Sequence, residues 1–82
     1  MKLEELKKRI REVEEMLGGI GFSPYIVKIW NDVTELQGDF VPEVKEAIEA
    51  RGFQMVHSFQ GEDKKTTFYV WKKGNIAITM HT

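Results

Sequence analysis

The chain of 82 residues carries 12 basic and 13 acidic side chains, which gives a net charge of −1, and it contains no cysteine. Its length fits one domain spanning residues 1–82, and its 41% hydrophobic content is too high for a disordered chain. The lack of thiols excludes disulfides, thiolate metal sites and thiol nucleophiles, and the near-neutral charge argues against a general polyanion binder.

The hydropathy pattern gives no sign of a membrane protein. No apolar run approaches the roughly 18 residues of a membrane span. The opening Lys2-Leu3-Glu4-Glu5 does not resemble a signal peptide. We therefore expect a cytoplasmic protein that makes no contact with a membrane.

The first segment has the pattern of an amphipathic helix over residues 3–17. Its apolar residues recur at steps of three and four and form one stripe: Leu3, Leu6, Ile10, Val13 and Leu17. Charged residues, Arg9 among them, fill the other positions, and Gly18-Gly19 is expected to end the helix. The spacing also fits coiled-coil a and d positions. The segment is shorter than the roughly three heptads that indicate a coiled coil, so we expect packing against a sheet.

The middle of the chain predicts a strand and a second helix. Residues 25–30 are rich in β-branched and aromatic side chains and are typical of a strand. Pro42 is favourable in the first turn of a helix, which runs through Ala50 and is expected to stop at Gly52. Residues 31–41 between them have no clear pattern.

The last thirty residues predict three antiparallel strands, over residues 53–60, 67–71 and 76–81. We expect the last hairpin to turn through a three-residue loop, Lys72-Lys73-Gly74, which pairs Trp71 with Asn75 and Phe68 with Ile78. A two-residue loop is rejected because it would place inward residues opposite outward ones. The inward face then holds Phe53, Met55, His57, Phe59, Phe68, Val70, Ile76, Ile78 and Met80.

These elements predict an α+β fold, a two-layer α/β sandwich in the order α-β-α-β-β-β. Both helices would cover one face of a four-stranded mixed sheet. A right-handed crossover through the second helix would make the first two strands parallel. The simplest strand order is 1-2-3-4, and other positions of the first strand remain open.

The other sheet face should be polar if water covers it. Instead it is predicted to hold Val56, Tyr69 and Trp71, with Trp30 on one of the two possible faces of the first strand. Three explanations compete for these side chains: burial under the first helix, contact with a second copy or another protein, and stacking on nucleic-acid bases. We favour burial or protein contact, because Tyr and Trp are common in ordinary interfaces.

The sequence offers little catalytic chemistry. His57 and His81 have no cysteine partner and no metal-ligand spacing, so no metal and no cofactor are expected. Gly18-Gly19-Ile20-Gly21 follows a helix and precedes a strand, the reverse of a phosphate-binding loop. Asp32 and Asp39 flank the loop over residues 31–39, where we expect turn or cap residues rather than a catalytic site.

We therefore expect a non-enzymatic module that binds through its aromatic sheet face, either to itself as a homodimer or to another protein. The expected contact residues are Trp71, Tyr69, Trp30 and Val56, with Lys73 and Gln54 at the rim. The alternative is a single-stranded RNA or DNA binder that stacks bases on Tyr69 and Trp71. Its phosphate contacts would come from the hairpin lysines Lys64, Lys65, Lys72 and Lys73. A weaker alternative is a small enzyme that uses the loop over residues 31–39.

Overall fold

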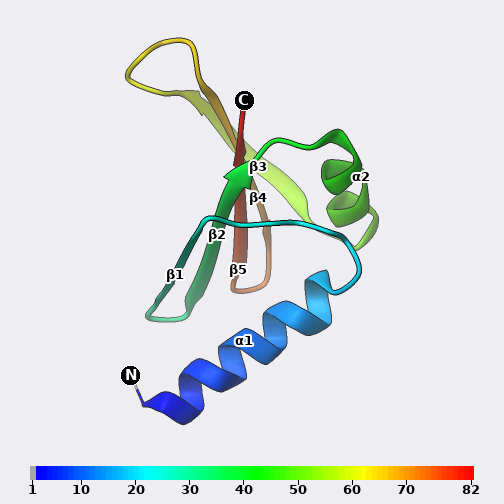
Figure 1. Ribbon diagram of the computed structural model, residues 1–82, viewed down its shortest axis with the longest axis vertical. Coiled ribbons are helices and arrows are strands. Elements are labelled where there is room, and N and C mark those ends of the chain that lie inside the picture. The colour runs from blue at the N-terminus through cyan, green and yellow to red at the C-terminus, as the bar shows by residue number, and fades with distance from the viewer. Residues whose placement is uncertain (1) are drawn as a thin grey trace.

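Two helices and five strands form the computed structural model, which describes residues 2–82 (Figure 1). The elements in chain order are α1 (Leu3–Leu17), β1 (Ile26–Trp30), β2 (Val33–Asp39), α2 (Pro42–Ala50), β3 (Gln54–Gln60), β4 (Thr67–Lys73) and β5 (Ile76–His81). The predicted α+β class and both predicted helices are confirmed. α1 ends at Gly18-Gly19, where Gly19 has a φ of 83°, and the chain leaves α2 through Gly52 with a φ of 96°.

The sheet has five strands, not the predicted four, in the order β1-β2-β5-β4-β3. The extra strand is β2, which occupies most of the segment that had no clear pattern. The sheet is mixed, because β2 and β5 are parallel neighbours and the other pairs are antiparallel. The simplest predicted order, 1-2-3-4, is not formed, because β5 and β4 separate β2 from β3. The prediction that the strands at residues 25–30 and 53–60 are parallel is wrong, since β1 runs opposite to β3.

β1 and β2 form a tight hairpin through Asn31-Asp32. Trp30 pairs with Val33, so only these two residues make the turn. Asn31 has a φ of 49°, a conformation that asparagine tolerates better than most residues. The hairpin continues directly from β1, which is why residues 33–39 are a strand and not a loop.

The register of the last hairpin differs from the prediction and reverses the side-chain directions of β4. Lys73 pairs with Ile76, so the turn is the two-residue Gly74-Asn75 that the sequence argument rejected, with a φ of 58° at Gly74. Trp71 then pairs with Ile78 and points to the helix-covered face. The opposite face receives Phe68, Val70 and Lys72.

A β-bulge in β3 changes which of its side chains lie on each face of the sheet. Met55 pairs with Trp71 and His57 with Val70, so Val56 is the extra residue. The bulge switches the alternation within the strand. Met55 lies on the helix side, whereas His57 and Phe59 lie on the opposite face, where they were not predicted.

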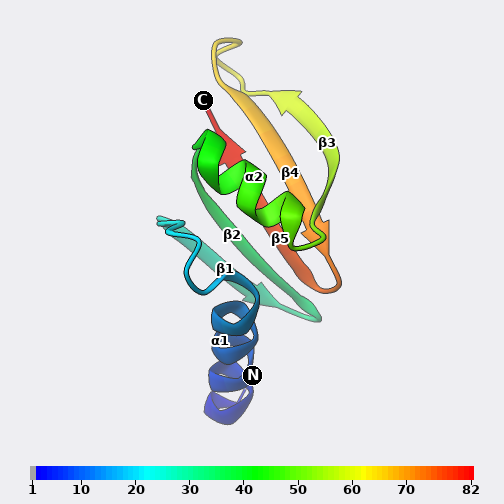
Figure 2. The ribbon, with the colours of Figure 1, turned by 90° about the vertical axis from the view of Figure 1, so that its right-hand side faces the viewer.

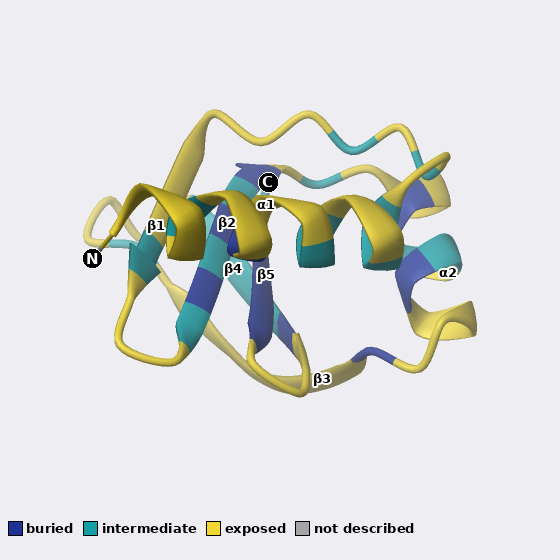
Figure 3. Cartoon of the chain, turned by 90° about the horizontal axis from the view of Figure 1, so that it is seen from below, coloured by how far each residue is buried: buried dark blue, intermediate teal, exposed yellow. Residues whose placement is uncertain are grey.

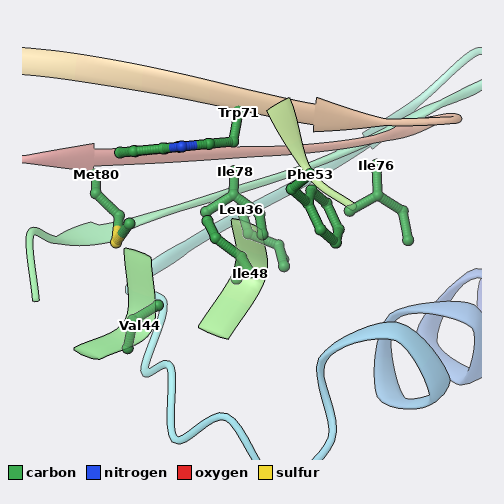
Figure 4. Close-up of a cluster of buried hydrophobic side chains, with 8 residues drawn as sticks. All are labelled: Leu36, Val44, Ile48, Phe53, Trp71, Ile76, Ile78 and Met80. Atoms are coloured by element: carbon green, nitrogen blue, oxygen red, sulfur yellow. The ribbon is translucent and has the colours of Figure 1, made fainter. Parts of the chain in front are cut away.

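The core lies between the sheet and α2 (Figures 2 and 4). Val44 and Ile48 of α2 are buried against the central strand β5 and its neighbours. The eight fully packed side chains are Leu36, Val44, Ile48, Phe53, Trp71, Ile76, Ile78 and Met80. Each such side chain stabilises the fold by about 1.5–3 kcal/mol through apolar burial, so this cluster dominates the stability of the domain.

α1 lies across the end of the sheet that holds the β1–β2 and β4–β5 turns (Figure 1). The side of α1 that meets the sheet centres on Arg9, Val13 and Met16, and Arg9 is its one buried residue. Arg9 donates hydrogen bonds to the carbonyl of Asn31 and, at 3.4 Å, to Thr34 Oγ1. The helix therefore does not centre its predicted apolar stripe on the sheet, and Leu3 and Ile10 remain exposed.

Candidate functional site: the helix-free sheet face

Both helices pack on one face of the sheet, which leaves the other face without a covering element. The strand pairings assign to this helix-free face the side chains that alternate with the core: Ile26, Lys28, Trp30, Val33, Glu35, Gln37, Asp39, Gln54, His57, Phe59, Phe68, Val70, Lys72, Ala77, Thr79 and His81. The face is thus more apolar than the solvent-facing side of an ordinary antiparallel sheet.

Five rings form a continuous row across one end of this face, from β3 through β4 and β5 to the start of β1. Adjacent ring centroids are 5.8 Å apart for His57 and Phe59, 5.0 Å for Phe59 and Phe68, 5.4 Å for Phe68 and His81, and 5.6 Å for His81 and Tyr25. The rings of Phe59 and Phe68 are nearly parallel, at 9°. We call these five residues the ring row.

The ring row is accessible from solvent over much of its length. Phe59 is 47% exposed and Tyr25 54% exposed, and His57 is exposed as well. Only Phe68 and His81, in the middle of the row, are partly covered by their neighbours. Exposed aromatic side chains that lie this close together are typical of a surface that binds a partner.

His81, between Phe68 and Tyr25 in the ring row, is held by polar contacts. Its Nδ1 donates to the carbonyl of Thr82 at 3.1 Å, so in the neutral ring Nε2 accepts the hydrogen bond of the Tyr25 hydroxyl. The carboxylate of Asp39 lies 3.7 Å from the same Nε2. A proton relay needs the acid and the hydroxyl at opposite nitrogens, so this arrangement positions the ring and lacks relay geometry.

Apolar side chains continue beyond the ring row. Trp30 is 53% exposed at the far end of β1, and Val56 is half-exposed at the β3 bulge. Gln54 is exposed on the same face as Phe59. Trp30, Val56 and Gln54 are therefore accessible on or beside this surface, and the pairing of β1 with β2 decides between the two faces that were open for Trp30.

The structure corrects the placement of the two residues that carried the sequence-based site. Trp71 is fully buried on the helix side, where its Nε1 donates to Glu49 Oε2 of α2 at 3.0 Å. Tyr69 is partly buried on the same side, with its ring 5.5 Å from that of Phe40. Lys73 also lies on the helix side and donates to the carbonyl of Arg51. None of the three lies on the helix-free face.

The four lysines of the nucleic-acid alternative are divided in the same way. Lys72 lies on the helix-free face and Lys73 on the helix side. Lys64 and Lys65 lie in the β3–β4 turn, beyond the end of the ring row. They share that turn with the acidic Glu62 and Asp63, which offset their charge.

Asp63 organises the β3–β4 turn. Its carboxylate accepts hydrogen bonds from the backbone N–H groups of Thr66 at 2.9 Å and Lys65 at 3.0 Å, and from the Thr66 hydroxyl at 2.8 Å. These bonds favour the ionised form and hold the pKa of Asp63 below its usual value. The acid is therefore a turn-forming group, which limits how positive this turn can be.

The weaker enzymatic alternative loses its geometric basis. Residues 31–39 form a tight turn and a strand, so Asp32 and Asp39 lie at opposite ends of β2 and do not share a loop. Within residues 2–82, no group of three or more histidine, aspartate or glutamate side chains is arranged to hold a metal ion.

The sequence did not predict that five residues would lie together on one surface: Tyr25, His57, Phe59, Phe68 and His81. The Gly74-Asn75 dipeptide was the available signal for a two-residue turn, because glycine readily adopts the positive φ that such turns need. The β3 bulge had no comparable signal.

The chain matches no protein-family model, no curated protein and no solved structure. Across the described part of the chain, neither helix is long and apolar enough to cross a membrane.

Proposed function

We propose that this protein is a non-enzymatic binding module whose helix-free sheet face is the contact surface for a protein partner. The observation that carries the proposal is the ring row, in which half-exposed rings such as Phe59 and Tyr25 lie on a sheet face that neither helix covers. The surface keeps the predicted residues Trp30, Val56 and Gln54, and the ring row takes the place of Tyr69 and Trp71.

The mix of side chains on the face supports a protein partner. Rings and branched apolar residues supply contact area, and Lys28, Glu35 and Lys72 supply charges of both signs. A mixed rim around an aromatic centre is the usual composition of a protein interface.

The test is a pair of matched surface variants. Peptides selected from a random library on the immobilised protein should bind Phe59→Ser at least about tenfold more weakly than the unmodified chain, as expected for an aromatic interface residue. Val27→Ser is the control, because Val27 is 54% exposed and its side chain lies on the helix side of β1. Equal affinities for all three proteins, measured by fluorescence polarisation, would contradict the proposal.

Single-stranded nucleic acid is a second candidate, favoured by one observation. The near-parallel Phe59 and Phe68 rings present an aromatic surface close to Lys64 and Lys65, and unpaired bases stack on such surfaces. Titration of a labelled mixed-sequence oligonucleotide at low salt tests it. Binding that weakens in Phe59→Ser and with added salt supports this candidate, and unchanged anisotropy at low salt removes it.

A further inference from the structure

A second unpartnered surface lies on α1, away from the ring row. Because α1 packs through Arg9, Val13 and Met16, the row Leu3, Lys7, Ile10 and Glu14 is left exposed. Figure 3 shows the exposed colour over much of α1. Leu3 is 65% exposed and Ile10 45% exposed. We call these four residues the outer row of α1.

An apolar trough runs beside the outer row, between α1 and the segment that leads into β1. Two adjoining cavities of about 170 and 270 Å³ share Val13, Glu14, Pro24 and Leu36 in their walls. The smaller cavity is closed by apolar side chains from both sides, Ile10, Val13, Pro24, Val27, Ile29 and Leu36. The outer row and the trough share Ile10 and Glu14, so together they form one continuous strip whose exposed apolar residues include Leu3, Ile10, Pro24 and Val27.

The charges on α1 are distributed asymmetrically along its axis. Residues 2–11 carry five basic and two acidic side chains, whereas residues 12–17 carry three acidic and no basic ones. A parallel neighbour of the same sequence would place like charges together. An antiparallel neighbour would place the basic half of one helix beside the acidic half of the other.

We infer that the occupant of this strip is the α1 of a second copy, packed antiparallel in a two-fold symmetric dimer. In that arrangement the outer rows of the two copies lie side by side, with Ile10 of each copy near the two-fold axis. Lys7 then faces Glu14 of the second copy, and the symmetry repeats this pair. A two-fold pair closes on itself and leaves both helix-free sheet faces open.

The required area explains why the trough must take part. A stable dimer buries roughly 800 Å² on each partner. An interface of this size takes about 20–30 residues from each partner, many more than the four of the outer row. Exposed side chains beside α1, such as Val27 and Pro24, are therefore expected to join the contact.

Reversal of charge is the sharpest test, because Lys7 and Glu14 are seven positions apart and too distant to pair within one helix. Sedimentation velocity over a concentration series should show a reversible dimer for the unmodified chain. Lys7→Glu and Glu14→Lys should each raise the dissociation constant about tenfold or more, since each replaces two attractive pairs with repulsive ones. The double variant, Lys7→Glu with Glu14→Lys, should return it to within about threefold of the original.

Two further variants separate this dimer from association through the sheet. Ile10→Lys should abolish the dimer while circular dichroism stays unchanged, and Phe59→Ser should leave it intact. Three outcomes would each overturn the inference. The unmodified chain could be a strict monomer at the highest concentration, the double variant could fail to recover the original dissociation constant, or Phe59→Ser could abolish the dimer. Peptide binding to the sheet face is measured separately, so loss of the dimer in Ile10→Lys does not affect the test of the proposed function.

Discussion

The indole Nε1 of Trp71 donates a hydrogen bond to Oε2 of Glu49 at 3.0 Å, and this bond joins the centre of β4 to α2. The ring itself is fully buried among the core side chains. Indole N–H groups that are buried nearly always have an acceptor, and here a surface carboxylate reaches inward to provide it. The bond forms on the face of β4 that meets the helices, so Phe68, Val70 and Lys72, which alternate with Trp71 and Tyr69, lie on the opposite face.

The two tryptophans should therefore differ sharply in their contribution to stability. Trp71→Ala removes a fully buried ring and should lower the free energy of unfolding by about 3–5 kcal/mol. Trp30→Ala removes a half-exposed ring and should cost less than about 1 kcal/mol. Urea denaturation followed by circular dichroism measures both. Equal losses would mean that the register of β4 against β5 is not the one described.

Glu49 should make the fluorescence of Trp71 dependent on pH. Hydrogen bonds from Lys45 and from Trp71 hold the pKa of Glu49 below its ordinary value of 4.5. In a Trp30→Phe background Trp71 is the only tryptophan, so the emission excited selectively from tryptophan should change with a midpoint below pH 4.5. The stability that the ionised carboxylate contributes is complete above pH 4.5 and is lost as the pH falls through the lower, folded-state value.

Glu49→Gln in the same background is the control for this titration. Glutamine keeps an oxygen that can accept the indole hydrogen bond but has no proton to gain in this range. Its emission should therefore stay constant where that of the parent changes. A midpoint at or above 4.5 in the parent, or the same transition in Glu49→Gln, would contradict the assignment.

Local signals in the sequence were sufficient to predict where the two helices begin and end. Gly18-Gly19 and Gly52 ended them because a positive φ is inexpensive for glycine, and Pro42 marked the start of α2. These signals act within one or two turns of chain and need no knowledge of the partner element. The α+β class followed from the order of such segments.

The surface could not be derived in the same way, because it depends on pairings between strands. One residue in the length of the β4–β5 turn decides whether Trp71 or Val70 faces the helices. The bulge at Val56 then decides the face of Phe59. Each error reverses the side-chain directions over a length of strand, so Tyr69 and Trp71 were assigned to the face that Phe59 and Phe68 occupy.

The side of α1 that faces the sheet also differed from the prediction, and for a different reason. The apolar stripe predicted that Ile10 would face the sheet, yet the buried position is Arg9. The β1–β2 turn presents the carbonyl of Asn31 to the helix, and a guanidinium satisfies it together with Thr34 Oγ1. Polar groups of a distant turn thus set the orientation of the helix, a relationship that periodicity within α1 does not contain.

Arg9→Met should loosen α1 without unfolding the sheet. Methionine keeps the apolar stem of the side chain and removes both hydrogen bonds, which should lower the free energy of unfolding by about 1.5–3 kcal/mol. Amide hydrogen exchange should show faster exchange in α1 and little change in β4 and β5. Arg11→Met is the control, since Arg11 is exposed, and it should change neither measurement. Equal stability of the two variants would contradict an anchoring role for Arg9.

Gly38 of β2 lies against residues 22–23 of the segment that leads into β1. A Cβ at this position would lie 2.8 Å from Cε1 and 3.1 Å from Cζ of Phe22, and 3.1 Å from the carbonyl oxygen of Ser23. These separations are shorter than van der Waals contact, so Gly38→Ala must displace residues 22–23. We expect a loss of about 1–3 kcal/mol in the free energy of unfolding, typical of overpacking in a close-packed interior.

A double-mutant cycle with Phe22→Ala separates this steric effect from the intrinsic cost of the substitution. Two of the three short separations are to the Phe22 ring, so Gly38→Ala should cost clearly less in the Phe22→Ala background than in the unmodified chain. The Ser23 carbonyl remains in place, which should leave a residual cost. Because Phe22 also lines the trough beside α1, Gly38→Ala should weaken the proposed dimer as the ring is displaced. A cost of Gly38→Ala that is the same in both backgrounds would show that the ring is not what requires glycine at this position.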